Sequence, residues 1–343
     1  MIDNIDYTIS EKDNVFCSKL PNIVTIHEKV NQYVSMGRGG DNDTRIITAF
    51  AEIIERYSLW SQQADLISSY FPHNQKHEML SPLKQLLPLG SLLDNRVVEW
   101  KKYQSEVDGH EIYIHRPVNV RNYASYFVHT SNGSAVHETK REAIKSAKDE
   151  LLERHLYNIF WLFEKNLFTY DFSCEVIKYT TELGWKIDFF TITDYVSCTL
   201  CVMTNIRDSR FASEGIVIGL SYGKREEPCL RAYTECLQTL EAYLAFDKNI
   251  NCSSLFYLSG AGTDELQAKI NCALSSNPIS ITEDILKNND VYYFTEGTLH
   301  DLVYCEVVIP MTIPLQTDAI NHLRLDQEFL GFVKSIPKYN PLG

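Results

Sequence analysis

The stretch that decides the fold is VSMGRGGDNDTRIITAFAEIIERYSLW, residues 34–60. An extended segment comes first, and three glycines among residues 37–40 then mark a turn. The apolar residues that follow recur with helical spacing, which predicts an amphipathic helix over about residues 44–61. The segment is therefore a strand, a glycine turn and a helix in sequence.

Two later stretches repeat this order. Residues 126–156 carry an Asn-Gly turn before a helix expected over residues 138–163, and residues 215–246 enter a helix near Pro228. The turn glycine precedes a helix glutamate by twelve residues in two of the copies, Gly40 to Glu52 and Gly223 to Glu235. The chain thus contains a weak internal repeat.

Five further segments alternate polar and apolar residues and are rich in β-branched and aromatic side chains, which predicts strands. They are residues 110–118, 185–193, 196–204, 290–296 and 302–310. A short polar turn predicts a hairpin between the second and the third. We expect an α+β fold in which mixed or antiparallel sheets pack against helices, as a single domain over residues 1–343. Residues 62–108 resemble a less regular insertion, and the prolines of residues 335–343 predict an extended tail.

Composition excludes several classes of protein. Of the 343 residues 44% are hydrophobic, enough for a sizeable core, and 32 Lys and Arg against 45 Asp and Glu give a net charge of −13. An acidic surface repels phosphate backbones, so we expect no nucleic-acid binding. No apolar run is long enough for a membrane span, and the first residues do not resemble a secretory signal. Nine cysteines at irregular spacing favour a reducing compartment, and we expect a soluble cytoplasmic protein.

Each of the three helices presents one stripe of polar side chains beside an apolar face, to which we assign Ile47 and Leu230. The stripes consist of Glu52, Glu55 and Arg56; of Glu142, Glu150 and Glu153; and of Arg231, Glu235 and Gln238. A solvated face is the ordinary explanation for any one of them. Carboxylates stacked on one stripe nevertheless repel each other, and Mg²⁺ relieves such repulsion by taking oxygen ligands. Three stripes behind three turns are compatible with a metal and phosphate site.

The motifs Glu52-Ile-Ile-Glu55-Arg56 and Glu150-Leu-Leu-Glu153-Arg154, followed by Arg231-Ala-Tyr-Thr-Glu235-Cys-Leu-Gln238, resemble the ATP-binding signature of the YcaO family. Gly37-Arg38-Gly39 is similar to the family's Gly-Lys-Gly turn, with Arg in place of Lys, and Ser131-Asn132-Gly133 to its Ser-Asn-Gly turn. The resemblance covers about residues 34–245.

This resemblance implies ATP and Mg²⁺ as cofactors. The residues that it places around the nucleotide are Arg38, Glu52, Glu55, Arg56, Glu142, Glu150, Glu153, Arg154, Arg231, Glu235 and Gln238. The glutamates and Gln238 are implied as Mg²⁺ ligands, and Arg231 as a catalytic contact to the phosphates. Pro337 and Pro341 are similar in placement to the proline-rich carboxyl terminus of cyclodehydratases, so a catalytic role is implied for them too. Since the carboxylates repel one another, replacing Glu150 or Glu235 by Ala should leave the nucleotide-free protein at least as stable.

The activity implied is ATP-dependent activation of a backbone amide in a ribosomally made precursor peptide, with cyclodehydration of Cys, Ser or Thr to thiazoline or oxazoline. Such enzymes belong to the biosynthesis of bacteriocin-like and microcin-like products. We expect no fused peptide-binding region, and therefore a separate E1-like partner protein that captures the leader peptide; a flavin dehydrogenase is a further expected partner. Thioamide formation with an external sulfur donor, or a non-catalytic nucleotide-binding scaffold, are the alternatives.

The motif Cys198-Thr-Leu-Cys201 has the spacing of a zinc site. No second pair of this kind accompanies it, and tetrahedral zinc needs four ligands. We therefore interpret both residues as core cysteines.

Overall fold

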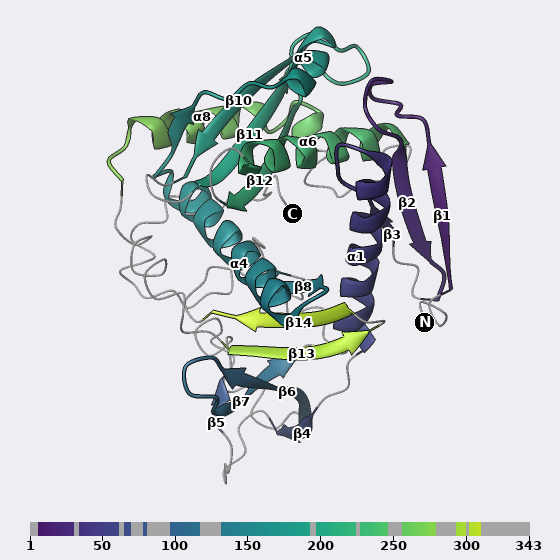
Figure 1. The fold of residues 1–343 in the computed structure, drawn as a ribbon. Coiled ribbons are helices and arrows are strands. Elements are labelled where there is room, and N and C mark those ends of the chain that lie inside the picture. Colours follow the sequence, from purple (N-terminus) through teal and green to yellow (C-terminus); the bar gives the residue numbers. More distant parts are fainter. Residues whose placement is uncertain are drawn as a thin grey trace. The chain divides into compact units, whose positions relative to one another are not determined.

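The computed structural model describes residues 6–30, 34–61, 65–69, 78–80, 97–116, 132–192, 197–223, 227–245, 256–278, 293–299 and 302–309 (Figure 1). They form two compact units. The first contains the described residues up to Ile53 and the segment Leu156–Thr282. The second contains Ile54–His155 together with the strands β13 (Tyr293–Leu299) and β14 (Leu302–Val308).

The described part of the first unit holds two antiparallel sheets. A three-stranded sheet has the order β1-β2-β3, and a four-stranded sheet the order β12-β11-β10-β9. Their strands are β1 (Tyr7–Lys12), β2 (Ile23–Glu28), β3 (Val34–Met36), β9 (Phe168–Tyr170), β10 (Trp185–Thr191), β11 (Ser197–Asn205) and β12 (Ile216–Gly223). The strand β12 consists of apolar residues except near its end and is buried over its first six positions, which is typical of a strand covered by a helix.

Four described helices begin in or belong to this unit: α1 (Asn42–Ser61), α5 (Glu175–Glu182), α6 (Glu227–Ala245) and α8 (Thr263–Ser275). The Asp41 carboxylate caps α1, since its Oδ1 accepts a hydrogen bond of 2.7 Å from the Thr44 N–H. Helix α6 packs on β12 and β11. Pro228 lies in its first turn, where the missing N–H costs no hydrogen bond.

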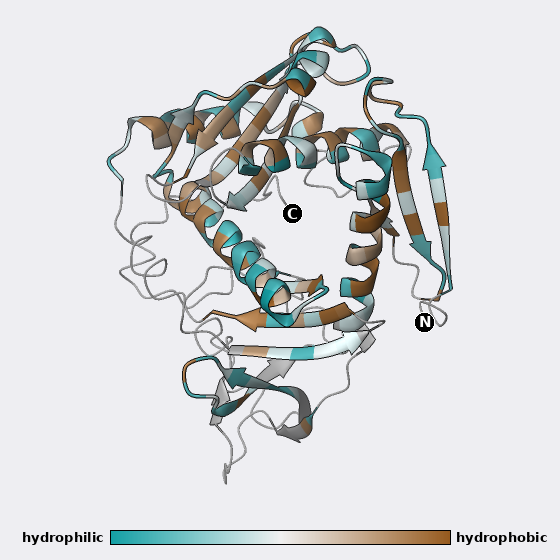
Figure 2. Ribbon diagram, in the orientation of Figure 1, coloured by the Kyte–Doolittle hydropathy of each residue, from teal (hydrophilic) through white to brown (hydrophobic). Residues whose placement is uncertain are grey.

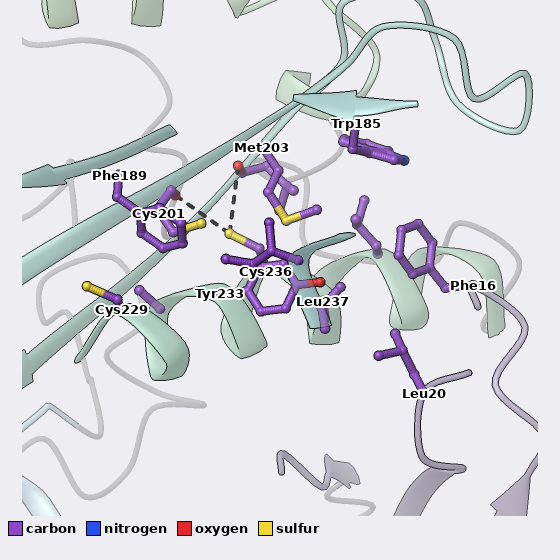
Figure 3. Close-up of a cluster of buried hydrophobic side chains, with 14 of the residues drawn as sticks. Phe16, Leu20, Trp185, Phe189, Cys201, Met203, Cys229, Tyr233, Cys236 and Leu237 are labelled. Carbon is purple, nitrogen blue, oxygen red and sulfur yellow. Dashed lines mark hydrogen bonds between the residues drawn. The ribbon is translucent and has the colours of Figure 1, made fainter. Parts of the chain in front are cut away.

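The main core of the first unit lies between α6 and the four-stranded sheet (Figure 3). Tyr233, Cys236 and Leu237 of α6 face Cys201 and Met203 of β11, and all five are at most 2% exposed. The Cys236 thiol donates to the Cys201 carbonyl at 3.6 Å. Burial raises the pKa of the Cys236 thiol, as expected for a cysteine that serves as a small apolar side chain. Cys198 is equally buried, which agrees with a core role for both cysteines of the zinc-like motif.

The second unit contains a sheet of seven described strands in the order β5-β7-β6-β13-β14-β8, with β4 paired to β6. The pairing of β5 with β7 is parallel and the rest are antiparallel, so the sheet is mixed. The remaining strands are β4 (Leu66–Ser69), β5 (Glu78–Leu80), β6 (Val97–Ser105), β7 (Glu111–Arg116) and β8 (Ser134–His137).

Helix α4 (Lys140–Phe163) changes character along its length (Figure 2). Its first turns alternate buried and exposed faces, whereas residues 155–163 are buried on every side. Seven of these nine residues are apolar or aromatic, which favours burial, and the polar His155 and Asn158 are buried with them. The final carbonyls need partners, and Lys269 of α8 donates to the Trp161 carbonyl at 3.1 Å. The ammonium group also lies 4.9 Å from the centre of the Trp161 ring. Both contacts lie within the first unit.

These elements confirm the α+β prediction with antiparallel and mixed sheets. Two details were wrong. Ile47 is 66% exposed and Leu230 is 43% exposed, because each helix turns another face to its core. The hairpin of β10 and β11 is antiparallel as predicted, while its turn at residues 193–196 and the tail at residues 335–343 lie outside the described residues. No described helix has the length and apolar character of a membrane span.

Candidate functional site

The turn Gly37-Arg38-Gly39 packs tightly against the start of α1. A Cβ on Gly37 would lie 1.9 Å from the Arg45 carbonyl oxygen, and Gly39 has φ +152°, so neither position suits another residue. The Thr48 hydroxyl accepts a hydrogen bond from the Arg38 N–H and donates to the Arg38 carbonyl, both at 2.8 Å. The backbone of Arg38 is therefore fixed while its side chain is exposed. An exposed guanidinium on a fixed turn suits an anionic ligand.

Glu235 is fixed by the strand beneath its helix. A Cβ on Gly219 of β12 would lie 1.9 Å from the Ala232 carbonyl oxygen, so the glycine lets α6 approach the strand closely. Among the described strands β12 lies at the end of its sheet, and on this strand a side chain accepts a backbone hydrogen bond. The Leu220 N–H donates to Glu235 Oε2 at 2.6 Å. The carboxylate is thus held at the strand edge.

Gln238 lies one helical turn after Glu235 and joins α6 to the glycine turn. Its Nε2 donates to the Met36 carbonyl at 2.5 Å, next to Gly37. This contact orients the amide so that its carbonyl oxygen, the atom a metal would use, turns away from the Met36 oxygen. Two candidates of the third stripe are therefore oriented by backbone groups of the first unit.

Arg231 is exposed at the start of α6 and forms an ion pair with Glu227, four residues earlier. Such an exposed pair contributes little to stability and can exchange partners. The guanidinium is thus available for a phosphate only in competition with Glu227.

Glu150 of α4 repeats the arrangement of Glu235 in the second unit. Its Oε2 accepts a hydrogen bond of 3.1 Å from the N–H of Gly133. Gly133 has φ +84°, and a Cβ there would lie 2.6 Å from the Val307 carbonyl oxygen, so the predicted Asn-Gly turn requires glycine. In two copies of the repeat, a helix carboxylate accepts a backbone N–H from the segment just before its own helix.

Glu142 has a local role at the start of α4. The Thr139 hydroxyl accepts from the Glu142 N–H at 3.3 Å and donates to Glu142 Oε2 at 2.8 Å, which resembles a capping box. His137 Nδ1 lies 3.0 Å from the same oxygen. These contacts account for Glu142 without a metal, although they do not prevent its carboxylate from binding one.

The remaining candidates on α1 and α4 are half-buried. They are Glu52, Glu55, Arg56, Glu153 and Arg154. Glu153 and Arg154 lie 3.5 Å apart at Oε1 and Nη1, with about 15% of each side chain exposed. The intermediate exposure of all five differs from that of a fully solvated face.

The structure groups the candidates within each unit. Arg38, Glu52, Arg231, Glu235 and Gln238 belong to the first unit, and Glu55, Arg56, Glu142, Glu150, Glu153 and Arg154 to the second. Among the described side chains, no three of the His, Cys, Asp or Glu type stand together as a metal site. Pro337 and Pro341 lie outside the described residues.

Sequence reasoning missed a buried ion pair in the first unit, between Arg45 of α1 and Glu241 of α6. The side chains are 4% and 1% exposed, and Arg45 Nη1 lies 3.0 Å from Glu241 Oε2. A signal was present, because Arg45 falls on the same helix face as Ala49 and Ile53, four and eight residues later, and both are buried. A charged residue on the apolar face of a helix indicates a buried charge, which needs a partner.

Comparison with known proteins gives the family. A family model described as YcaO cyclodehydratase, with ATP and Mg²⁺ binding, matches residues 36–299. This match confirms, for the family, the expected cofactors and an ATP-dependent enzyme of the cyclodehydratase class. No curated protein is similar enough in sequence to be recognised as a relative.

Several solved structures share the fold. A heterocyclase in complex with substrate and cofactor matches with a TM-score of 0.67 and 16% identity over 93% of this chain, which spans only 52% of the heterocyclase. A chain of the E. coli Microcin synthetase McbBCD complex gives 0.65 and 14% over 89% of this chain and 88% of its own. YcaO from Methanopyrus kandleri, bound with AMPPCP and Mg²⁺, gives 0.62 and 14% over 99% and 91%. At these identities the likeness establishes the fold.

Proposed function

The chain belongs to the YcaO family, and from this premise we propose that it cyclodehydrates a ribosomally made precursor peptide with ATP. Cys, Ser or Thr residues of the peptide would become thiazoline or oxazoline in a microcin-like biosynthesis. The observation that carries the proposal is the family match over residues 36–299, because that range includes all three carboxylate helices. The Microcin synthetase McbBCD complex has also been solved with pro-MccB17 bound, which supports a precursor peptide as substrate.

The donor set fits Mg²⁺ and a nucleotide. Carboxylate and amide oxygens are the ligands that Mg²⁺ prefers, and Glu52, Glu235 and Gln238 provide them in the first unit. The second unit provides Glu55, Glu142, Glu150 and Glu153. When bound, Mg²⁺ with ATP supplies an electrophilic phosphoryl group whose charge is partly neutralised. Backbone hydrogen bonds hold Glu150 and Glu235 in one orientation, so little ordering remains for binding.

The arginines would serve the phosphates. Arg38 extends from a turn whose backbone is fixed by Thr48, and Arg231 would leave Glu227 for a phosphate oxygen. Arg56 and Arg154 would contact the nucleotide or orient neighbouring carboxylates. Guanidinium groups suit this task because they remain charged and donate two hydrogen bonds to one phosphate.

In the proposed chemistry, the side-chain oxygen or sulfur of the peptide attacks the preceding carbonyl carbon. The former amide oxygen takes the γ-phosphoryl group of ATP and leaves as phosphate, while the nucleophile and the amide nitrogen each lose a proton. The peptide loses one water per ring and ATP becomes ADP. Pro337 and Pro341 are proposed to act at this step through the tail.

A separate E1-like protein is proposed to bind the leader peptide, and a flavin dehydrogenase to oxidise the rings to azoles. The presence of a structural neighbour in a multiprotein synthetase complex supports such partners. We place the reaction in the cytoplasm, the reducing compartment that nine cysteines favour.

Mass spectrometry of the precursor tests the proposal directly. The precursor is incubated with ATP, Mg²⁺ and the partner protein, in one sample alone and in a second sample with an external sulfide donor. The proposal predicts a peptide that is lighter by one water for each ring in both samples. A thioamide would instead make it heavier, because sulfur replaces oxygen. An unchanged peptide in the complete mixture would favour the scaffold alternative.

A further inference from the structure

The buried pair of Arg45 and Glu241 joins the two elements that carry the candidate contacts of the first unit. Arg45 Nη1 and Nη2 lie 3.0 and 3.1 Å from the two carboxylate oxygens of Glu241, which is bidentate geometry. Arg45 Nε donates to the Gly39 carbonyl at 3.1 Å, and Nη1 also donates to the Asn22 carbonyl at 3.1 Å. One guanidinium therefore holds both α6 and the last residue of the glycine turn.

Glu241 is fixed from its other side by Asn14. The amide Nδ2 of Asn14 donates to Glu241 Oε1 at 2.6 Å and to the Pro21 carbonyl at 2.8 Å. Asn14 Oδ1 in turn accepts from the N–H groups of Phe16 and Cys17 at 3.0 Å. The Glu241 carboxylate is therefore held by Asn14 as well as by Arg45.

A buried ion pair is a poor device for stability alone. Removing two charges from water costs several kcal/mol per ion, and well-packed apolar replacements are often neutral or stabilising. What such a pair provides is a defined geometry, because a planar guanidinium bonds two oxygens only in a narrow range of orientations. The pair therefore calls for an explanation in terms of position.

Its place in the fold supplies that explanation. Glu241 follows Gln238 by three residues on the same side of α6, and Gln238 bonds the Met36 carbonyl. The segment from Met36 to Arg45 is thus attached to α6 at both ends, with Arg38 between the two attachments. A shift of α6 by a fraction of an ångström would move Arg38 relative to Glu235 and Gln238.

We propose that Arg45 and Glu241 are positioning residues, which set the distance between the Arg38 turn and the Glu235–Gln238 stripe for the nucleotide phosphates. The inference rests on the proposed function. The affinity for nucleotide would then depend on Arg45 and Glu241, two side chains that do not contact the nucleotide.

The test uses the full chain, Mg²⁺·AMPPCP as the probe, and two measurements: the dissociation constant and the melting temperature without nucleotide. The double variant R45M/E241L replaces the pair by apolar side chains, and Asn14 keeps its bond to Pro21. We expect a melting temperature close to that of the wild type and a dissociation constant raised about tenfold or more. R45K, which keeps the charge and loses the fork, should weaken binding to a similar extent.

R210K is the matched control. Arg210 also forms a bidentate pair, with Asp208, and also donates to backbone carbonyls, but those of Val15 and Phe16 rather than the glycine turn. It should leave the dissociation constant unchanged.

The outcomes separate the two proposals. Equally tight binding of Mg²⁺·AMPPCP by the wild type and by a folded variant, R45M/E241L or R45K, would overturn the positioning role. That result would leave the proposed function intact. If R45M/E241L does not fold, R45K decides alone. A wild-type chain that does not bind Mg²⁺·AMPPCP would overturn the proposed function and, with it, this inference.

Discussion

The Glu235→Ala variant separates a metal ligand from a surface residue. Its carboxylate accepts the Leu220 N–H at 2.6 Å, and a hydrogen bond to a charged group contributes about 1.5–3 kcal/mol. Partial exposure and relief of repulsion between carboxylates offset some of this. We therefore expect the free energy of unfolding without nucleotide to fall by about 1–2 kcal/mol. Sequence alone predicts unchanged or higher stability for this variant, because it shows the repulsion between carboxylates and not the hydrogen bond to Leu220.

Urea denaturation measures this change, and thermal unfolding with Mg²⁺·ATP measures binding. A ligand at 100 times its dissociation constant stabilises the native state by about 2.7 kcal/mol, a gain expected for the wild type and absent from Glu235→Ala. Glu235→Gln keeps an oxygen that accepts from the Leu220 N–H, so its free energy of unfolding should fall by less than about 1 kcal/mol. It should still fail to bind the nucleotide, because the carboxylate charge is gone. Thr234→Ala on the same helix is the control for both measurements, since that hydroxyl bonds the Arg231 carbonyl of α6 itself. A Glu235→Ala variant with wild-type stability and the full stabilisation by Mg²⁺·ATP would show that Glu235 neither bonds Leu220 to a measurable extent nor binds the metal.

Three further predictions follow from the packing, the titration of one histidine, and the tail. Gly219→Ala should lower the free energy of unfolding by about 1–3 kcal/mol, because its Cβ would lie 1.9 Å from the Ala232 carbonyl oxygen. Gly297→Ala is the control in the same urea experiment, and it should be near neutral because no described atom lies within 4 Å of its Cβ. Burial lowers the pKa of His155 from 6.5 to about 4, so the unfolded chain binds more protons between these values and stability should rise with pH across them by up to about 3 kcal/mol. His155→Gln should remove this rise of the free energy of unfolding with pH. A variant whose stability changes with pH as in the wild type would contradict the assignment to His155. Deleting residues 335–343 should slow the reaction more than it weakens Mg²⁺·ATP binding; equal rates would exclude the tail from catalysis.

Local patterns predicted much of the fold. The helices expected over residues 44–61 and 138–163 are Asn42–Ser61 and Lys140–Phe163, since turn glycines and helical periodicity are strong local signals. The repeat also has a physical counterpart, because Glu150 and Glu235 both bind a backbone N–H that precedes their helix.

Side-chain contacts between residues far apart in the chain could not be predicted from the sequence. The local pattern around Arg45 indicates a buried charge, but it does not indicate the partner Glu241, which lies 196 residues away in the chain. The same limit explains Ile47, which periodicity assigns to the apolar face although it is 66% exposed, because the buried face of α1 includes the charged Arg45. The residues of the nucleotide site stay a prediction from sequence, whereas the hydrogen bonds that orient Glu150, Glu235 and Gln238 are seen only in the structure.

If ATP activates a peptide amide, the amide oxygen atom must end in phosphate, and isotope labelling follows that atom. The precursor peptide carries ¹⁸O in its backbone carbonyls and is incubated with the chain, the proposed E1-like protein and Mg²⁺·ATP. We expect the label to appear in the released phosphate, one atom for each ring formed. Ordinary hydrolysis takes its oxygen from water instead. Unlabelled phosphate together with an unmodified peptide would contradict the account.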